Sequence, residues 1–213
     1  MLVADVMSTN VVSIPSTTSM SDARRIMETH RVRRLPVIDR GKLVGIVAKD
    51  DLDKAGPSQL TTFSMHELTY LLSKITVKEV MHRDVVTVTQ DMTAEEAVTL
   101  AQSKKVGSLI VIKGEQVVGI CTTNDFFYRI LNPILGIGLA GSRIVVHNCN
   151  KGPDIEKVVA IINKLKVDIT NLFIIDMPET NKHDLVVHLA ISDPSAVITE
   201  LEKLGCPVEA RNR

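Results

Sequence analysis

The sequence predicts an α+β fold made of two similar units followed by a third unit of a different kind. The first observation is an internal repeat: VADVMSTNVVSI, which begins at Val3, returns as VKEVMHRDVVTV at Val77, 74 positions later. The second is that helical and strand periodicities follow one another in the same order in both copies. The third is a change in the order of elements after the glycine-rich stretch GIGLAG at 136–141.

The repeat keeps one register, without a gap, from Val3 to Asp51. The tripeptide VGI occurs at Val44 and again at Val118, and Asp51 corresponds to Asp125. Apolar positions correspond to apolar positions along this length, which indicates two copies of one structural unit.

Each copy is expected to have the order β-α-β-β-α. A short strand at 11–14, or at 85–88, leads to a helix, in which Ala23, Ile26 and Met27 show the i, i+3, i+4 spacing of a buried face. Two β-rich runs, RLPVID and LVGIVA in the first copy, then form a hairpin, and a second helix begins at KDDL or TNDFF.

Another helix is predicted between the copies, in SMHELTYLLSKI. Ser64 and Glu67 have the spacing of a capping box, and an apolar stripe indicates packing in the core or at a subunit interface. The stripe consists of Met65, Leu68, Leu71, Leu72 and Ile75. The predicted division of the chain is a first unit at 1–56, a connecting amphipathic helix at 57–75, a second unit at 76–131, a glycine-rich linker at 132–141 and a third unit at 142–213.

The stretch GIGLAG has the G-x-G-x-x-G spacing of a dinucleotide-binding turn, and Glu156 lies twenty positions after its first glycine. Such a turn needs a strand before the glycines and a helix directly after them, because the helix N-terminus receives the pyrophosphate. Here a helix that Pro133 is expected to end comes first, and the strand SRIVVHN follows. We therefore interpret GIGLAG as a hinge between domains.

The third unit has the order β-α-β-β-α-β, which is typical of a ferredoxin-like sandwich. A strand at 144–148 precedes a helix that begins near Pro153, two strands follow in VDITNLFIIDM and HDLVVHLAI, and a helix at 195–204 precedes a last strand at 207–210. His188 is out of phase with the inward set Leu185, Val187, Leu189 and Ile191. We therefore expect it to point away from the helix-covered core, and we expect no metal at His147, Cys149 and His188.

The composition excludes several classes of protein. Lys and Arg together number 25, as do Asp and Glu, so the chain lacks the basic surplus of a general nucleic-acid or membrane-surface binder. Three cysteines without a C-x-x-C spacing indicate reduced thiols. The N-terminus has no signal-peptide pattern and no run is long enough to cross a bilayer, so we expect a cytoplasmic protein.

The two copies resemble a pair of cystathionine-β-synthase (CBS) domains. The likeness is carried by HRVRRLPVID with GIVAKDD and by KKVGSLIVI with GICTTND, and it covers essentially all of residues 1–131. It implies that the two units pack sheet to sheet about a pseudo-twofold axis, with adenine nucleotides in the clefts where the units meet.

The CBS signature, a glycine, two apolar residues, Ser or Thr, two residues and Asp, is complete at 119–125. The resemblance implies a nucleotide site here, the Asp125 site, in which Asp125 accepts ribose hydroxyls and Thr122 and Arg33 contact phosphate. The implied site consists of Met7, Val12, Val32, Arg33, Ile120, Thr122, Asn124 and Asp125. Two alternatives remain open: HRVRR as a solvated face, and Asp125 as a helix N-cap alone.

A second, weaker site is implied at the symmetry-related position, the Asp51 site. It would consist of Ile46, Asp51, Met81, Val86 and Gly107. Ala48 stands at the hydroxyl position, so one phosphate donor is missing, which corresponds to about tenfold in affinity. N-capping alone is the alternative role for Asp51.

Residues 142–213, with KGPDIEKVVAIINKL and DITNLF, resemble an ACT domain, the small amino-acid-sensing module, and the combination is similar to the acetoin-utilisation regulatory (AcuB-type) proteins. In ACT domains the effector lies at the turn after the first strand, at a dimer interface. The resemblance therefore implies an amino-acid effector site at Asn150, Lys151 and Gly152, although Gly152 also suits a plain helix-entry turn.

No nucleophile, triad or pair of carboxylates is supported by the order of elements, so the expected function is that of a sensor and not of an enzyme. The regulatory ligand would be an adenine nucleotide (AMP, ADP, ATP or S-adenosylmethionine), with no catalytic cofactor. A homodimer and an unidentified protein partner are expected. The alternatives are a scaffold without a ligand and an NAD-dependent oxidoreductase that uses Gly136 and Gly138.

Overall fold

The computed structural model describes residues 1–55, 74–177 and 182–211, which belong to two compact units, Met1–Phe126 and Phe127–Arg213. The predicted connecting helix at 57–75 lies, except for its last two residues, outside the described residues and stays a prediction.

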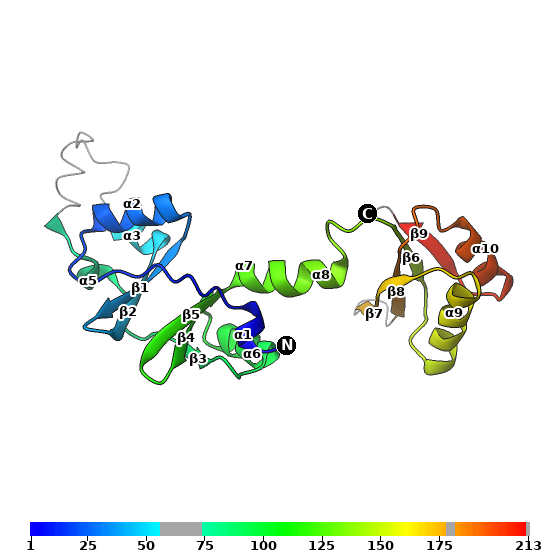
Figure 1. Ribbon diagram of the computed structural model, residues 1–213, viewed down its shortest axis with the longest axis horizontal. Helices are drawn as coiled ribbons and strands as arrows, with labels where there is room; N and C mark the ends of the chain where they lie inside the picture. The colour runs from blue at the N-terminus through cyan, green and yellow to red at the C-terminus, as the bar shows by residue number, and fades with distance from the viewer. Residues whose placement is uncertain (56–73, 178–181, 212–213) are drawn as a thin grey trace. The chain divides into compact units, whose positions relative to one another are not determined.

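The N-terminal unit contains the two copies of the repeat (Figure 1). The first copy consists of α1 (Val3–Val6), α2 (Met20–His30), β1 (Arg34–Asp39), β2 (Lys42–Ala48) and α3 (Lys49–Ala55). The second consists of α5 (Val77–Val80), β3 (Thr87–Thr89), α6 (Ala94–Ser103), β4 (Ser108–Lys113), β5 (Gln116–Thr122) and α7 (Thr123–Phe126). The predicted helices and hairpins are confirmed, and each copy also begins with a one-turn helix that the sequence analysis did not predict.

Local chemistry explains the helix starts and the hairpins. The Ser19 hydroxyl caps α2 by accepting a bond from the backbone N–H of Asp22 at 3.1 Å, and Thr93 and Glu96 form a capping box on α6. Both hairpins are antiparallel and shift register at the same place, after Val37 and after Val111. In the first copy, α2 and α3 lie side by side and pack with β1 and β2 on a core that includes Met27, Leu35 and Leu52 (Figure 1).

The predicted first strands differ between the copies. β3 pairs in parallel with β4, whereas the predicted strand at 11–14 is wrong except for one parallel bridge from its last residue to Val37. In the second copy the N–H of Ile110 donates to the carbonyl of Val86 at 3.1 Å. Pro36 stands at the position of Ile110, and proline has no N–H to donate, so the ladder is shorter in the first copy.

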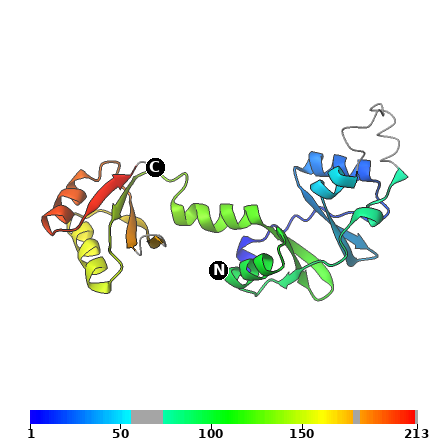
Figure 2. The ribbon, with the colours of Figure 1, turned by 180° about the vertical axis from the view of Figure 1, so that it is seen from behind.

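The start of each copy pairs with the other copy. Ser8 forms an antiparallel bridge with Ile120 in β5, and its counterpart His82 forms one with Ile46 in β2. In the same way α1 lies beside α6 (Figures 1 and 2), where the N–H of Val3 donates to the carbonyl of Met92 at 2.8 Å. This exchange brings the first residues of one copy to the end of the second hairpin strand of the other.

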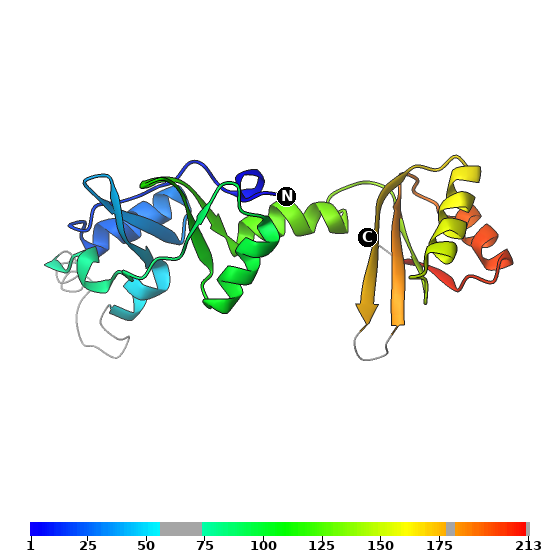
Figure 3. The same cartoon turned by 90° about the horizontal axis from the view of Figure 1, so that it is seen from below.

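The C-terminal unit confirms the predicted order β-α-β-β-α-β. After a π-helical turn η1 (Phe127–Leu131) and α8 (Asn132–Leu135), it contains β6 (Ser142–Val146), α9 (Gly152–Lys164), β7 (Ile169–Met177), β8 (Lys182–Leu189), α10 (Ser195–Lys203) and β9 (Val208–Arg211). The antiparallel sheet has the order β7-β8-β6-β9, and α9 and α10 cover one face of it (Figure 3). The core lies between them and contains Ile144, Leu185, Val187, Ile162 and Leu201.

The prediction that Pro133 ends its helix is wrong, because the helix continues through α8 to Leu135. A proline is tolerated in the first turn of a helical segment, where its missing N–H would have no acceptor. Gly136, in the left-handed conformation at φ 62°, caps α8. The GIGLAG stretch thus follows a helix and precedes strand β6, as predicted, which is the reverse of the order in a dinucleotide-binding turn.

Within the described ranges, no helix combines the length and the apolar character that crossing a membrane requires.

Candidate functional site

A cavity of about 600 Å³, the Asp125 cavity, lies between the two copies of the repeat. Its size falls within the range of about 300–1,000 Å³ that is typical of small-molecule sites. It is lined by Ser8, Asn10, Val12, Arg31, Val32, Arg33, Arg34, Pro36, Asp50, Ile120, Thr122, Thr123, Asn124 and Asp125. All residues predicted for the Asp125 site except Met7 are among them, so the structure brings together side chains that lie far apart in the sequence.

Asp125 is the best-connected side chain in this cavity. Its Oδ2 accepts hydrogen bonds from the backbone N–H of Thr122 at 2.7 Å and from the Thr122 hydroxyl at 2.6 Å. Its Oδ1 accepts a bond from the hydroxyl of Ser8 at 2.9 Å. Asp125 is the third residue of α7 and bonds back to Thr122, the residue before the helix, so it is the acidic partner in a capping-box contact and not the N-cap itself. This contact uses only one of the two carboxylate oxygens.

Ser8 is a cavity residue that the sequence analysis missed. It reaches Asp125 because the backbones of Ser8 and Ile120 exchange two hydrogen bonds, of 2.9 and 3.0 Å. Nothing in the local pattern around Ser8 indicates this pairing. The repeat could have indicated a shared role for Ser8 and His82, because they occupy corresponding positions and both precede the first strand region of their copies.

Met7 lies behind the cavity wall. Its side chain is 6% exposed and packs on β5, where a Cβ added to Gly119 would lie 2.5 Å from the Met7 sulfur. Met81 and Gly45 repeat this arrangement in the other copy, at 2.7 Å. The glycine of the CBS signature is thus needed for the close approach of a methionine.

Three arginines, Arg31, Arg33 and Arg34, line one side of the cavity. Arg33 forms an ion pair with Asp50 at 3.1 Å, and both side chains are largely exposed, at 71% and 68%. Such exposed pairs contribute about 0–1 kcal/mol, so Arg33 can exchange Asp50 for a phosphate at little cost.

The Asp51 site has different chemistry. Asp51 accepts a hydrogen bond from the backbone N–H of Ala48 at 2.8 Å, as Asp125 does from Thr122, but its other oxygen lies 3.0 Å from Nε2 of His82. Histidine therefore takes the place of Ser8. The Arg34 guanidinium lies over Gly107, where an added Cβ would be 2.6 Å away.

The remaining residues predicted for the Asp51 site also have structural roles. Ile46 forms a bridge with His82 at the end of β2, Met81 packs on Gly45, and the carbonyl of Val86 pairs with the N–H of Ile110. Ligand binding at this site stays a prediction.

Asn150 and Lys151 lie in the exposed segment before α9, and Gly152, also exposed, is the first residue of that helix. A Cβ on Gly152 would meet no atom within 4 Å, so this glycine is not required by packing. Binding of an amino acid at this turn stays a prediction.

His188 lies on the sheet face opposite α9 and α10, as predicted, because the helix-facing cluster contains its neighbours Val187 and Leu189. It is fully buried, and its Nε2 accepts a bond from Arg143 Nε at 3.1 Å. His147 instead contacts Asp184, with Nδ1 3.0 Å from the carboxylate. Among the described residues, no group of three or more His, Cys, Asp or Glu side chains is arranged to hold a metal ion.

Comparison with known families identifies the repeat. The CBS domain family matches residues 3–58 and 77–132, about half of the chain. The match does not extend to residues 142–213, so their resemblance to an ACT domain stays a prediction.

Curated relatives are similar over part of the chain. The chain is 31% identical over 125 residues to an inosine-5′-monophosphate dehydrogenase of Korarchaeum cryptofilum. The alignment covers 58% of this chain and 23% of that protein. It is 30% identical over 126 residues to an L-aspartate semialdehyde sulfurtransferase of Methanocaldococcus jannaschii. That alignment covers 58% of this chain and 22% of that protein. The chain spans about a quarter of the length of the curated relatives it matches.

Two solved structures are similar in fold. The CBS domain pair of protein MJ0100, in complex with 5′-methylthioadenosine and S-adenosyl-L-methionine, has a TM-score of 0.50 and 28% identity, and covers 60% of this chain and 94% of that one. An acetoin utilization protein (AcuB) from Vibrio cholerae has a TM-score of 0.52 and 31% identity, and covers 62% of this chain and 91% of that one.

Proposed function

Because the chain belongs to the CBS domain family, we propose that it is a non-catalytic regulatory protein that binds an adenine nucleotide in the Asp125 cavity. The observation that carries the proposal is the placement of Asp125, which faces a cavity of suitable size between the two copies. The adenosyl compounds bound by the similar MJ0100 domain pair support a ligand of this class.

The carboxylate of Asp125 can accept a ribose hydroxyl without rearrangement. A carboxylate offers about four acceptor positions, and Ser8 and Thr122 use three of those on Asp125. One ribose hydroxyl can take the fourth position. The second hydroxyl can bind when the Ser8 or Thr122 hydroxyl turns away to accept or donate elsewhere.

The remaining walls suit the rest of a nucleotide. The half-buried apolar side chains of Val12, Val32 and Ile120 offer surface to the adenine ring, and Asn124 adds an amide for hydrogen bonding. The Arg33 guanidinium presents paired N–H donors, which match the geometry of phosphate oxygens.

Regulation follows from the position of the ligand between two copies. A ligand that contacts both walls binds more tightly to the arrangement in which the walls are close than to one in which they are apart. The difference between these two affinities sets how far the ligand can shift the conformational equilibrium. We expect this shift to change the packing of a homodimer and the engagement of a protein partner. Under the same proposal, the C-terminal unit is an ACT-like module that senses an amino acid at Asn150–Gly152, as in an AcuB-type protein.

The two alternatives make different predictions. An NAD-dependent oxidoreductase would need Gly136 and Gly138 at a strand-to-helix turn, whereas Gly136 caps the C-terminus of α8. A scaffold would bind no small molecule at all.

Calorimetric titration of AMP, ATP, S-adenosylmethionine and NAD into the full chain tests the proposal. We expect saturable binding of at least one adenosyl ligand, without turnover, that Asp125→Ala abolishes. Asp125→Asn is a second variant, because its amide oxygen can still accept the bond from the backbone N–H of Thr122 while its NH2 group donates to the Ser8 hydroxyl, which can also accept. Asp51→Ala is the matched control from the other copy and is expected to leave this binding unchanged. If no adenosyl ligand binds, the scaffold alternative is favoured.

A further inference from the structure

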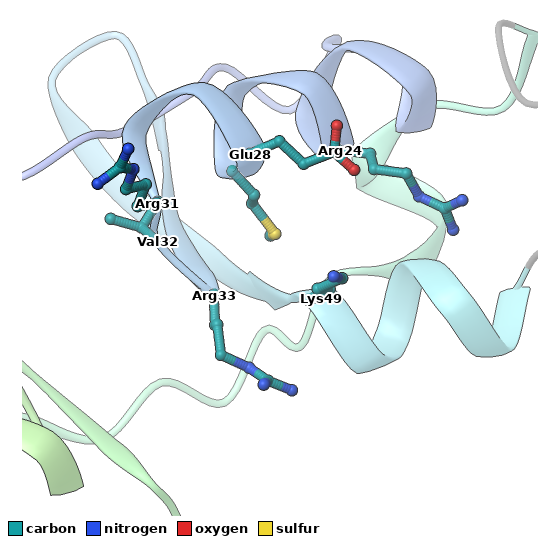
Figure 4. Close-up of a pocket in the computed structure, with 7 residues that line it drawn as sticks. Arg24, Glu28, Arg31, Val32, Arg33 and Lys49 are labelled. Atoms are coloured by element: carbon teal, nitrogen blue, oxygen red, sulfur yellow. The ribbon is translucent and has the colours of Figure 1, made fainter.

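A second cavity lies next to the Asp125 cavity, on the α2 side of the segment 31–33. This basic cavity has a volume of about 230 Å³ and is formed by the last turns of α2, the segment that follows it and the first residue of α3 (Figure 4). It is lined by Arg24, Met27, Glu28, Arg31, Val32, Arg33 and Lys49.

The lining has a surplus of positive charge. Four of the seven side chains are cationic and one, Glu28, is anionic. Arg24 pairs with Asp53 at 2.7 Å and Arg33 with Asp50 at 3.1 Å. In the part of the chain that the structure describes, the side chains of Arg31 and Lys49 form no ion pair. Cations gathered in a concave surface raise its potential, which favours an anionic occupant.

The backbone holds these cations in place. Arg31 has the left-handed conformation, at φ 54°, and its N–H donates to the carbonyl of Glu28, so the chain turns sharply out of α2 at this residue. The N–H of Lys49 donates to the carbonyl of Arg33 at 2.9 Å, which ties the first residue of α3 to the same segment. These bonds fix the backbone from which Arg31, Arg33 and Lys49 line the basic cavity.

The basic cavity is continuous in its lining with the Asp125 cavity. Arg31, Val32 and Arg33 line both of them. A ligand whose ribose lies at Asp125 and whose phosphate meets Arg33 can therefore extend further phosphates toward Lys49.

We infer that the basic cavity binds the terminal phosphates of a nucleoside polyphosphate whose ribose lies at Asp125, an inference that rests on the function proposed above. The protein then prefers nucleoside di- and triphosphates to the monophosphate. It also prefers them to S-adenosylmethionine, which carries a positive sulfonium and no phosphate.

The test is calorimetric titration of AMP, ATP and S-adenosylmethionine, at one ionic strength and in EDTA, into the full chain and its variants. In the wild type we expect ATP to bind at least about tenfold more tightly than AMP, since charge-assisted contacts to phosphate are strong. Lys49→Met keeps the apolar stem and removes the charge. It is expected to weaken ATP binding about tenfold and to change AMP binding by less than about twofold.

Lys54→Met is the matched control, because Lys54 is exposed on the same helix and lines neither cavity. It should leave both affinities within about twofold, which separates a local contact from a general loss of charge. Lys49→Gln repeats the test should the methionine variant prove unstable in thermal unfolding.

The outcomes distinguish the two proposals. Equal affinities for AMP and ATP, or equal effects of Lys49→Met and Lys54→Met, overturn the terminal-phosphate inference. The proposed function still stands in that case if AMP binding depends on Asp125. If no adenosyl ligand binds to the wild type, both proposals fail.

Discussion

The hydroxyl of Ser8 donates a 2.9 Å hydrogen bond to Oδ1 of Asp125, although 117 positions separate the two residues. The contact joins the first residues of one repeat copy to the last helix of the other. The corresponding contact in the other copy is between His82 and Asp51, at 3.0 Å. The two related sites thus share one geometry but present a hydroxyl in one case and an imidazole in the other.

Ser8→Ala should lower the free energy of unfolding by about 1 kcal/mol, because one hydrogen bond to a carboxylate is lost. Chemical denaturation monitored by circular dichroism measures the change. Thr9→Ala, at the exposed neighbouring position, is the control and should have little effect. An equal loss in both variants would show that the Ser8 contact contributes nothing to stability.

Gly119→Ala should lower the free energy of unfolding by about 1–3 kcal/mol through overpacking. The new methyl group would lie 2.5 Å from the Met7 sulfur and 3.3 Å from the carbonyl oxygen of Ser8. In the background Met7→Ala the same change should cost less, and a double-mutant cycle measures the difference. Gly152→Ala, at a helical glycine with open space around it, should be neutral or stabilising.

Asp50→Asn should tighten the binding of phosphorylated nucleotides about three- to tenfold, because it removes a negative charge from the cavity lining and releases Arg33. Titration of AMP measures the effect. Asp53→Asn is the control, since Asp53 pairs with Arg24 and does not line the Asp125 cavity. Unchanged affinity in Asp50→Asn would contradict contact between Arg33 and phosphate.

Asp39 should contribute to acid unfolding. The hydroxyl of Ser16 and then its backbone N–H hold the pKa of Asp39 below its ordinary value of about 4. The unfolded chain therefore binds a proton more readily, so the contribution is present above about pH 4 and is lost as the pH falls through the lower folded pKa. Thermal unfolding between about pH 5 and pH 2 should depend less steeply on pH in Asp39→Asn than in the wild type. Parallel curves for the two proteins would refute the assignment.

Cys149 should react slowly with iodoacetamide. Burial, followed by the charge of Asp154, raises the pKa of its thiol, so little thiolate is present near neutral pH. Cys206 is less buried and should react first. Mass spectrometry of peptides after timed alkylation measures both rates, and faster labelling of Cys149 would contradict the structure.

Much of the fold could be predicted from residues that act locally. The spacing of Ala23, Ile26 and Met27 predicted α2, and the alternation of Leu185, Val187 and Leu189 predicted the buried face of β8 and the opposite orientation of His188. These predictions succeed because helical and strand periods are set by neighbouring residues. The prediction of a strand at 11–14 was wrong because the segment that it would pair with includes Pro36, which has no N–H to donate. The prediction that Pro133 ends its helix was wrong because the preceding π-helical turn allows the proline to stand in the first turn of the next helical segment.

The candidate site was predictable only in part. Thr122 and Asp125 lie in one short motif, and the resemblance to CBS domains implied that Val32 and Arg33 face them from the other copy. Ser8, Asp50 and Lys49 were missed because their roles depend on which segments the fold brings together.

The sequence by itself determined the two copies, their element order and the carboxylate and hydroxyl of 119–125, because each depends on a repeat or a spacing of a few residues. Only the tertiary structure decided that the start of each copy pairs with the other copy, that Met7 lies behind the wall and Ser8 in front of it, and that one arginine segment lines two cavities. The physical reason is that backbone pairing between distant segments depends on which N–H and carbonyl groups are left free when the hairpins have formed, and no local pattern records this.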